Sequence, residues 1–456
     1  MHSLFGTDGI RGLAGEPPLD TSTIFAVGRA VGEFLQASSG QPLEFARGRQ
    51  APRVLLGEDT RESSPWVTSY LAAGLRAAGV EVVSAGVLPT PAIAELVRAR
   101  GFAAGAIVSA SHNPYRDNGI KLIGASGMKL PDEVEAQLEQ RVGQLRPAQE
   151  PAPWSPPADL GLAEDYAAHL RRLVGDTDLA RLHLVVDCAH GAATRVAPAL
   201  FRSLGAAVTS INAAPDGRNI NAGCGALHPE SLRQKVLEVG ADLGVAFDGD
   251  ADRAVFASRA GKIVDGDGVL FVAGCWLKET EKLKPDTVVG TVMTNLGLEV
   301  ALRRAGLTLV RTAVGDRYVL AEMLRRGANL GGEQSGHIIF LDDVPTGDGI
   351  LTALKVCSIL LASGKTLDQL VADLELFPQA LVNVRVRQKI PFEQLPAVKH
   401  AIQKATATLG ERGRVLVRYS GTEPLARVMV EAETQVEVER WSHEIARALR
   451  EAIGSN

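Results

Sequence analysis

Hydrophobic residues gather along most of the chain in short continuous runs, each followed by an amphipathic stretch. Three segments repeat one plan of apolar strand, amphipathic helix, glycine and second apolar strand, at residues 54–80, 184–206 and 288–307. Each glycine stands where the C-terminus of a helix favours a left-handed residue. Runs without polar alternation are typical of strands covered on both faces. Any α/β protein repeats strand and helix, but the shared Arg and Gly spacing favours three α/β units of similar design.

The last part of the chain follows a different pattern. Residues 381–387 alternate in the manner of a half-exposed strand, and two more short strands are predicted at 415–418 and 428–431. A helix is expected at about 435–452. These elements predict a small α+β domain at the C-terminus.

Domain boundaries are predicted from changes in composition. A length of 456 residues is too great for one core. A proline cluster predicts a linker or long surface loop after the first domain, at Pro147, Pro151, Pro153, Pro156 and Pro157. We expect four domains, at residues 1–157, 158–255, 256–370 and 371–456.

The composition is that of an ordinary folded protein, with 46% hydrophobic residues, 22% charged residues and a net charge of -5. This balance favours neither nucleic acid nor an anionic membrane as a partner. Apolar runs such as 269–277 are too short to span a membrane. The four scattered cysteines argue against a zinc site or a disulfide framework. Without a signal-peptide pattern at the N-terminus, a cytoplasmic location is expected.

Three aspartates at alternate positions follow the apolar run 243–247. Asp248, Asp250 and Asp252 would repel one another unless a cation lies between them. Hard oxygen ligands suit Mg²⁺, which then needs a phosphate oxygen to complete its shell. A solvated acidic turn is the alternative, and the preceding buried strand disfavours it. An EF-hand is excluded because its sixth and twelfth loop positions are Arg253 and Arg259 here.

A second polar cluster, around Ser111, follows the apolar run that ends at residue 108. We expect its small-residue turn to expose the Ser111 hydroxyl as a nucleophile. His112 and Lys121 lie near in sequence as proton acceptor or positive charge. A plain turn is the alternative interpretation. A hydrolase nucleophile elbow is excluded because residues 109 and 113 are not glycine.

The third polar cluster lies at residues 331–337, where glycines bracket Glu333 and Ser335. Glycines allow the backbone to approach a ligand closely. The two polar side chains suit recognition of the hydroxyls of a polyhydroxylated ligand. A tight turn without a ligand is the alternative.

The fourth cluster combines hydroxyl groups, glycine amides and arginines at the end of a predicted strand. It consists of Arg418, Ser420, Gly421, Thr422 and Arg427. Backbone N–H groups and a bidentate guanidinium can hold a phosphate without a P-loop. A surface hairpin is the alternative. The simplest arrangement of the four clusters is a cleft that each domain lines with one loop.

These four motifs, in this order and over essentially the whole chain, resemble those of the α-D-phosphohexomutases. Residues 5–12, Phe-Gly-Thr-Asp-Gly-Ile-Arg-Gly, are similar to the N-terminal signature of that family. The resemblance implies three topologically similar α/β domains plus a C-terminal α+β domain around a central cleft. It also implies a phosphorylated Ser111, whose phosphate binds Mg²⁺ together with Asp248, Asp250 and Asp252. The intermediate, which also serves as activator, would be a bisphosphorylated hexosamine or hexose.

The same resemblance implies a role for each remaining candidate residue. The groups that surround the transferring phosphate and assist proton transfer would be Arg11, Lys121, Arg253 and His337, with His112 beside Ser111. The groups that bind sugar hydroxyls would be Glu333 and Ser335. The groups that bind the other phosphate of the substrate would be Arg418, Ser420, Gly421, Thr422 and Arg427.

Finer features resemble the branch of the family that acts on glucosamine phosphates. Residues 216–221, 224–225 and 228–230 are similar to that branch and lack the Phe-Pro-x-His stretch usual in the glucose and mannose branches. Gln334 and residues 377–379 also fit, whereas Ala226-Leu227 departs from the usual Ser-Thr. The resemblance therefore implies an isomerase that interconverts glucosamine 6-phosphate and glucosamine 1-phosphate. This reaction supplies UDP-N-acetylglucosamine for the cell wall.

Several alternatives remain open at this point. A phosphomannomutase or phosphoglucomutase of the same family is the nearest. A phosphatase with an aspartate nucleophile would need Asp-x-Asp followed by x-Thr or x-Val, but the last position is Asp252. A non-catalytic sugar-phosphate sensor is the third. The expected partner is a small sugar phosphate, and a homodimer is left open.

Overall fold

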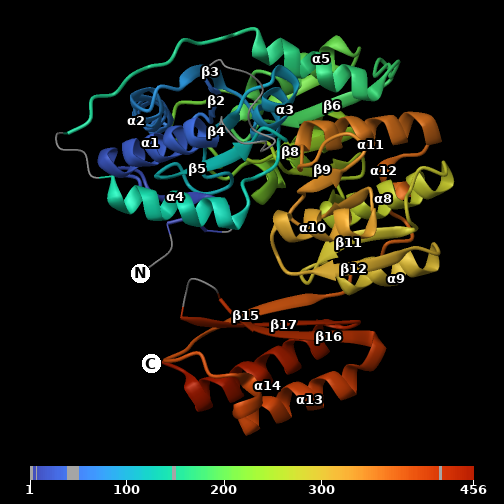
Figure 1. Cartoon of the computed structure of the whole chain (residues 1–456). Helices are drawn as coiled ribbons and strands as arrows, with labels where there is room; N and C mark the ends of the chain where they lie inside the picture. Colours follow the sequence, from blue (N-terminus) through green and yellow to red (C-terminus); the bar gives the residue numbers. More distant parts are fainter. Residues whose placement is uncertain (1–3, 7, 39–50, 146–149, 421–423, 456) are drawn as a thin grey trace. The chain divides into compact units, whose positions relative to one another are not determined.

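The computed structural model describes residues 4–6, 8–38, 51–145, 150–420 and 424–455. These residues form two compact units, whose elements are labelled in Figure 1. The first unit contains the described residues up to 293 together with 307–372, and the second contains 294–306 and the chain from 373 onward. The chain therefore enters the second unit twice.

Three sheets form the first unit, and their strand orders are similar. The first sheet has the order β1-β5-β4-β2-β3, formed by Ile10–Leu13, Asp117–Gly124, Ala104–Val108, Arg53–Glu58 and Glu81–Val87. The second has the order β10-β9-β8-β6-β7, formed by Ile263–Val264, Ala254–Ser258, Leu243–Phe247, His183–Asp187 and Ala207–Ile211. The third has the order β12-β11-β13-β14, formed by Thr308–Thr312, Thr287–Thr291, Leu330–Gly332 and Ile338–Phe340.

In each of these sheets, one of the parallel strands forms an antiparallel hairpin with the next strand of the chain. The hairpins are β4–β5, β8–β9 and β13–β14. The turn of the first hairpin carries Ser111, the turn of the second carries Asp248, and the turn of the third carries Glu333. Three of the four predicted motifs therefore occupy the same topological position in three similar sheets.

Helices connect the strands as the hydrophobic pattern predicts. Those of the first unit are α1 (Thr21–Ser38), α2 (Ser64–Ala77), α3 (Thr90–Arg100), α4 (Asp132–Gln144), α5 (Leu162–Val174), α6 (Ala197–Ser203), α7 (Glu230–Val239), α8 (Gly266–Glu279), α10 (Asp316–Arg326), α11 (Gly349–Ser363) and α12 (Leu367–Leu370). The glycines of the three repeats, Gly79, Gly205 and Gly306, all have positive φ, as a helix C-terminus requires. Strands β4, β8 and β11 are buried along their whole length, so the sheets are covered on both faces.

The second unit is an antiparallel sheet with helices packed against it. Its strands are β15 (Gln379–Arg385), β17 (Leu425–Ala432) and β16 (Gly413–Tyr419), in that order across the sheet. The helices α13 (Pro396–Leu409) and α14 (Gln435–Ile453) pack against this sheet, and α9 (Leu296–Arg304) also belongs to the unit. Trp441 of α14 and Val428 and Val430 of β17 belong to one buried apolar core. The predicted α+β domain is confirmed.

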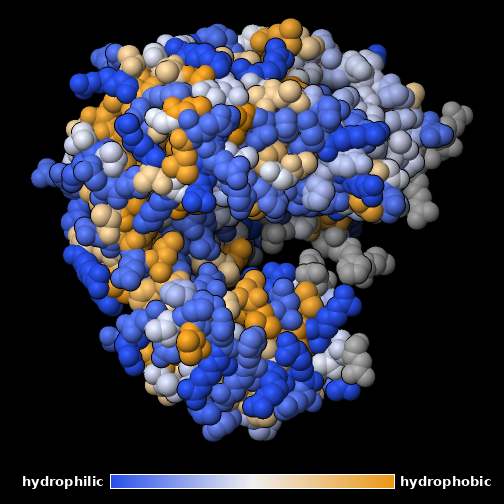
Figure 2. Space-filling model, turned by 180° about the vertical axis from the view of Figure 1, so that it is seen from behind, coloured by the Kyte–Doolittle hydropathy of each residue, from blue (hydrophilic) through white to orange (hydrophobic). Residues whose placement is uncertain are grey.

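The proline-rich segment is a loop where the structure describes it. Residues 150–157 form neither helix nor strand. The Trp154 amide donates to the Ser69 carbonyl, and the Arg76 guanidinium lies 4.7 Å from the centre of the Trp154 ring. These contacts hold the loop against α2. On the face shown in Figure 2, hydrophobic residues lie singly or in small groups among hydrophilic ones, as on an ordinary globular protein. Within the described ranges, every helix is too short or too polar to cross a membrane.

The buried carboxylate of Asp348 links helix α11 to helix α5. Asp348 caps the N-terminus of α11 by accepting from the Leu351 amide at 2.9 Å. The Tyr166 hydroxyl of α5 donates to its other oxygen at 2.7 Å. Burial raises the pKa of Asp348 to about 6, and these hydrogen bonds offset only part of that rise. The folded protein therefore binds this proton more tightly than the unfolded chain does.

We expect Asp348→Asn to stabilise the protein at neutral pH relative to acidic pH. The unfolded carboxyl ionises near its usual pKa of 3.8 and the folded one near 6, so the wild type loses stability as pH rises through this window. Asparagine keeps an acceptor for Leu351 and carries no charge. The stability difference between variant and wild type should move by about 2 kcal/mol in favour of the variant from pH 4.5 to 7.5. Denaturant unfolding at both pH values measures it, and parallel stability profiles would contradict the assignment.

Candidate active site

Ser111 lies in the turn between β4 and β5 with its side chain buried. Only 1% of the residue is exposed, and its backbone has a φ of 50°. Its hydroxyl donates to Asp248 Oδ2 at 2.5 Å. The predicted exposure of this hydroxyl is wrong, because the β8–β9 turn of the second sheet covers it. The two turns approach so closely that a Cβ on Gly249 would lie 2.5 Å from the Ser111 carbonyl oxygen.

The buried side chain of Arg61 holds the Ser111 turn by hydrogen bonds to its backbone carbonyl groups. Arg61 Nη2 donates to the carbonyl oxygens of Ser111 and Asn113, each at 2.9 Å, and its Nε donates to Asp59 at 2.8 Å. From the second sheet's side, Asn221 Nδ2 donates to the same Ser111 carbonyl at 2.9 Å. The positive φ of Ser111 is thus fixed by several bonds to one peptide group. None of the predicted motifs includes this support, and its local signal in the sequence is Asp59-Thr60-Arg61 after β2.

The three aspartates of the β8–β9 turn converge. Ligand oxygens of Asp248, Asp250 and Asp252 lie within 4.8 Å of one another, and all three residues are buried. Within the described part of the chain, Asp250 Oδ1 and Asp252 Oδ1 have no hydrogen-bond partner. Buried carboxylate oxygens without a partner are costly unless a cation binds them. These residues therefore fit a divalent cation with oxygen ligands.

Electrostatics point in the same direction. Burial raises the pKa of Asp248 well above its usual value, and the charges of Asp252 and Asp250 raise it further. Three like charges in one buried place destabilise each other without a counter-ion. A bound cation would remove this repulsion.

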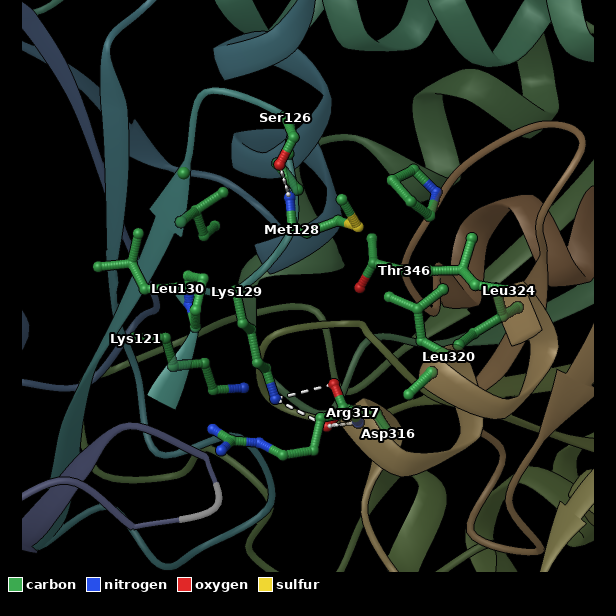
Figure 3. Close-up of a pocket in the computed structure, with 18 of the residues that line it drawn as sticks. Lys121, Ser126, Met128, Lys129, Leu130, Asp316, Arg317, Leu320, Leu324 and Thr346 are labelled. Atoms are coloured by element: carbon green, nitrogen blue, oxygen red, sulfur yellow. Dashed lines mark hydrogen bonds and ion pairs between the residues drawn. The ribbon is translucent and has the colours of Figure 1, made fainter. Parts of the chain in front are cut away.

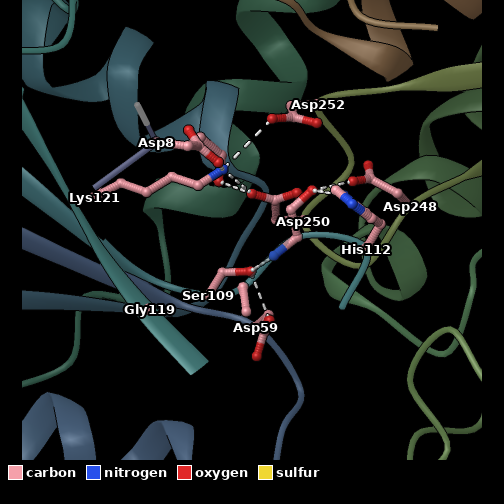
Figure 4. Close-up of polar contacts among 12 residues, drawn as sticks. Asp8, Asp59, Ser109, His112, Gly119, Lys121, Asp248, Asp250 and Asp252 are labelled. Atoms are coloured by element: carbon pink, nitrogen blue, oxygen red, sulfur yellow. Dashed lines mark hydrogen bonds and ion pairs between the residues drawn. The ribbon is translucent and has the colours of Figure 1, made fainter. Parts of the chain in front are cut away.

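Lys121 supplies part of the missing positive charge (Figure 4). Its Nζ lies 2.8 Å from Asp250 Oδ2, 3.6 Å from Asp252 Oδ2 and 3.4 Å from Asp8 Oδ2. Burial lowers the pKa of Lys121, but Asp250, Asp8 and Asp252 raise it more, so the net shift is upward. Thr90 Oγ1 also donates to Asp250, at 2.6 Å. Lys121 is therefore a fixed cation beside the aspartates, and its predicted role at the transferring phosphate stays a prediction.

His112 is a neutral neighbour of Ser111. Its Nδ1 lies 3.3 Å from Ser111 Oγ. Burial lowers the pKa of His112 to about 4, and the charges of Arg253 and Arg11 act in the same direction. An imidazole that is unprotonated at pH 7 can accept a proton. Arg11 reaches the turn by donating to the Ala110 carbonyl at 3.4 Å.

The turn between β13 and β14, which carries the candidate sugar-binding residues, contacts the chain just after the three aspartates. The Gly336 carbonyl accepts from the Ala254 amide at 3.1 Å, just beyond Asp252 and Arg253. The Arg253 amide in turn donates to Asp248 Oδ1 at 3.2 Å. Glu333 Oε1 accepts from the Gly315 amide at 3.0 Å.

Two buried side-chain atoms of this loop have unused hydrogen-bonding capacity, one on the half-buried Ser335 and one on the buried His337. Among the described residues, Ser335 Oγ and His337 Nδ1 have no hydrogen-bond partner. Such atoms suit a polar ligand. The first unit therefore brings together the predicted residues of three hairpin turns, with Arg11 and Lys121 beside them.

The second unit carries the arginine pair of the fourth motif. Arg418 of β16 lies directly opposite Arg427 of β17 in the antiparallel register. Burial lowers the pKa of Arg418, and the charge of Arg427 lowers it further. Lys389 Nζ donates to the carbonyl of the buried Ser420 at 2.6 Å, a contact that sequence analysis did not find. Gly421 and Thr422 lie outside the described residues. Paired cations of this kind favour an anion.

Comparison with known families defines the class of this protein. Models described as phosphoglucomutase/phosphomannomutase match residues 2–148 (alpha/beta/alpha domain I), 164–261 (domain II), 265–377 (domain III) and 381–448 (C-terminal domain). The chain belongs to the phosphoglucomutase/phosphomannomutase family. This finding confirms the predicted family and the predicted class of three α/β domains plus a C-terminal domain.

Two relatives and one solved structure are similar to this chain over nearly its whole length. The chain is 51% identical to a phosphoglucosamine mutase of Koribacter versatilis, over 100% of this chain and 98% of the relative. It is 50% identical to a phosphoglucosamine mutase of Solibacter usitatus, over 99% of each. Among solved structures, a phosphoglucomutase/phosphomannomutase family protein of Burkholderia thailandensis superimposes with a TM-score of 0.78 at 26% identity, over 99% of this chain and 98% of the other.

Proposed function

We propose that this protein interconverts glucosamine 6-phosphate and glucosamine 1-phosphate through phosphorylated Ser111. The observation that carries the proposal is the hydrogen bond from Ser111 Oγ to Asp248, one of three convergent carboxylates. Among the described residues, the other two each keep a buried oxygen without a hydrogen-bond partner. The name of the two relatives that are about half identical over their full length supports glucosamine as the sugar. The product serves the synthesis of UDP-N-acetylglucosamine for the cell wall.

The first half-reaction moves the phosphoryl group from Ser111 to the sugar. The bond between phosphorus and Ser111 Oγ breaks as a bond forms to the free hydroxyl of glucosamine 6-phosphate. The proton of that hydroxyl passes to a base, and Ser111 Oγ takes up a proton as it leaves. Neutral His112, with Nδ1 beside Ser111 Oγ, and His337, with its unpartnered Nδ1, are the candidate proton carriers. Mg²⁺, held by the three aspartates and the phosphate on Ser111, would supply charge stabilisation for the transferring oxygens.

The second half-reaction returns the other phosphate of the bisphosphorylated sugar to Ser111. Lys121, Arg11 and Arg253 keep positive charge around the phosphate in both directions. Glu333 and Ser335 bind sugar hydroxyls in either orientation. In the second unit, Arg418, Ser420 and Arg427, with the Gly421-Thr422 segment, bind the phosphate that is not being transferred.

We expect the highest catalytic efficiency with glucosamine 6-phosphate. The relevant comparison is kcat/KM for the 6-phosphates of glucosamine, glucose and mannose, measured with a trace of hexose bisphosphate as activator. An advantage of at least about tenfold for the amino sugar is expected, since one polar group that a site recognises gives discrimination of that order or more. A higher value for mannose or glucose would instead assign the chain to another branch. If none of the three is isomerised, the protein is a sensor or a phosphatase.

A further inference from the structure

A lysine outside the predicted motifs links two sides of the candidate active site. Lys129 follows β5, and its Nζ lies 2.7 Å from Asp8 Oδ1 and 2.8 Å from Asp316 Oδ1. Figure 3 shows its side chain reaching toward Asp316 at the start of α10. We call Asp8, Lys129 and Asp316 the lysine bridge. It joins the sheet that carries Ser111 to the sheet that carries Glu333.

The two ends of the lysine bridge, Asp8 and Asp316, lie next to candidate catalytic and sugar-binding groups. At one end, Asp8 also contacts Lys121, with Oδ2 3.4 Å from Nζ. At the other end, Asp316 Oδ2 lies 3.9 Å from His337 Nε2. The amide of the preceding Gly315 donates to Glu333 Oε1 at 3.0 Å. A displacement of Asp316 would therefore be passed directly to His337 and Glu333.

Beside the lysine bridge, side-chain packing contributes little to fixing the distance between the domain that carries Ser111 and the domain that carries Glu333. A cavity of about 570 Å³ lies between the domain that carries Ser111 and the domain that carries Glu333, with Met128 and Leu130 on one side and Leu320 and Leu324 on the other (Figure 3). Atoms that face a cavity lose the close contacts that normally hold neighbouring elements together. The distance between the two domains here consequently depends on ion pairs.

Lys129 and the two aspartates of the lysine bridge stabilise one another in their charged forms. Burial lowers the pKa of Lys129, but Asp316 and Asp8 raise it more, so the net shift is upward. Burial raises the pKa of Asp316, and Lys129 with His337 lowers it below its usual value. The side chains of the bridge are partly buried, with 24% of Lys129, 31% of Asp8 and 21% of Asp316 exposed, so removing one partner leaves a charge that water compensates only in part.

A second ion pair between the same domains provides a matched comparison. Arg317, the next residue of α10, contacts Asp132 and Glu135 of α4. Its partners lie on a helix that carries none of the candidate site residues. Arg317 therefore ties the domains together without leading to Ser111.

We propose that Lys129 and Asp316 are positioning residues that hold Glu333 and His337 at a fixed distance from phosphorylated Ser111. This inference rests on the proposed function and deepens it. Neither residue needs to touch the substrate. Their effect is on where the sugar-binding turn lies relative to the phosphoryl group, and a misplacement of about 1 Å is enough to cost roughly 100-fold in rate.

The test compares Lys129→Met, Asp316→Asn, Lys129→Arg and the control Arg317→Met. We expect kcat/KM for glucosamine 6-phosphate to fall by about 10- to 100-fold in both Lys129→Met and Asp316→Asn. Lys129→Met removes a positive charge and Asp316→Asn removes a negative charge. A purely electrostatic effect on the phosphate would therefore change kcat/KM in opposite directions in the two variants. Lys129→Arg should recover most of the activity, and Arg317→Met should stay within about threefold of the wild type.

A second measurement makes the inference independent of activity. Amide hydrogen exchange at residues 333–337 should be faster in Lys129→Met than in the wild type and unchanged in Arg317→Met. If Lys129→Met and Arg317→Met behave alike in this measurement, the positioning role is wrong. If the wild type fails to isomerise the sugar phosphate while the exchange difference is present, the proposed function fails and the bridge stands.

Discussion

Replacing Ser111 by alanine is expected to lower mutase turnover by roughly 10⁴-fold or more, the order seen when a covalent nucleophile is removed from an enzyme. Without the hydroxyl there is no acceptor for the phosphate of the bisphosphorylated sugar, and the protein cannot enter the cycle. Steady-state isomerisation of glucosamine 6-phosphate measures the loss. Retention of more than a few per cent of the activity would exclude Ser111 as the phosphoryl carrier.

This variant should still fold, with a loss of stability limited to the hydrogen bond of the Ser111 side chain, which separates chemistry from folding. Alanine adopts the same backbone conformation as serine, and Arg61 and Asn221 bind the carbonyl of residue 111 rather than its side chain. The hydrogen bond to Asp248 is lost, at a cost of about 1–2 kcal/mol. Ser69→Ala is a suitable control, because Ser69 donates within α2 to the Trp66 carbonyl and lies outside the site. That control should retain full turnover.

Replacing Asp250 by asparagine is expected to weaken magnesium binding and to lower kcat by roughly 10²- to 10³-fold, as loss of one preorganised charge in a site does. The change removes a ligand charge and also the nearest partner of Lys121, which lies 2.8 Å away. The buried ammonium would then be left with Asp8 and Asp252, both farther from it. The magnesium concentration that gives half-maximal activity should rise, and calorimetric titration with Mg²⁺ measures the affinity directly.

A buried aspartate of the same sheet provides the control for Asp250. Asp187, at the end of β6, accepts from the amides of Ala189 and Gly225 and from Asn212 Nδ2. Its oxygens are satisfied by the protein, so Asp187→Asn should affect stability and leave the magnesium requirement unchanged. Equal magnesium dependence in Asp250→Asn and the wild type would remove Asp250 from the metal site.

Local patterns in the sequence were sufficient for most of the fold. Uninterrupted apolar runs predicted the buried strands β4, β8 and β11, and the glycines with positive φ predicted where helices end. The alternating aspartates after a buried strand predicted a convergent carboxylate cluster. These features succeed because strand burial, helix termination and turn geometry depend on residues close together in the chain.

Features that depend on distant residues were not predictable from spacing. Ser111 was expected to be exposed, and the residue that buries it lies 137 positions later. Lys129 and Asp316 are 187 positions apart, so their ion pair leaves no local pattern. Arg61 holds a turn about 50 residues away through backbone carbonyl groups, which any residue supplies. The folding of the first sheet forms the Arg61 contact, and the pairing of domains within the first unit forms the other two.

In the proposed mechanism, Ser111 Oγ is the atom that carries the phosphoryl group. The most direct measurement treats the protein with ³²P-labelled glucosamine 1,6-bisphosphate, maps the labelled peptide, and then adds unlabelled glucosamine 6-phosphate in a single turnover. A phosphoserine mechanism predicts label on Ser111 that leaves with the sugar as bisphosphate. Label on Asp248, or label on Ser111 that the sugar phosphate cannot remove, would contradict it.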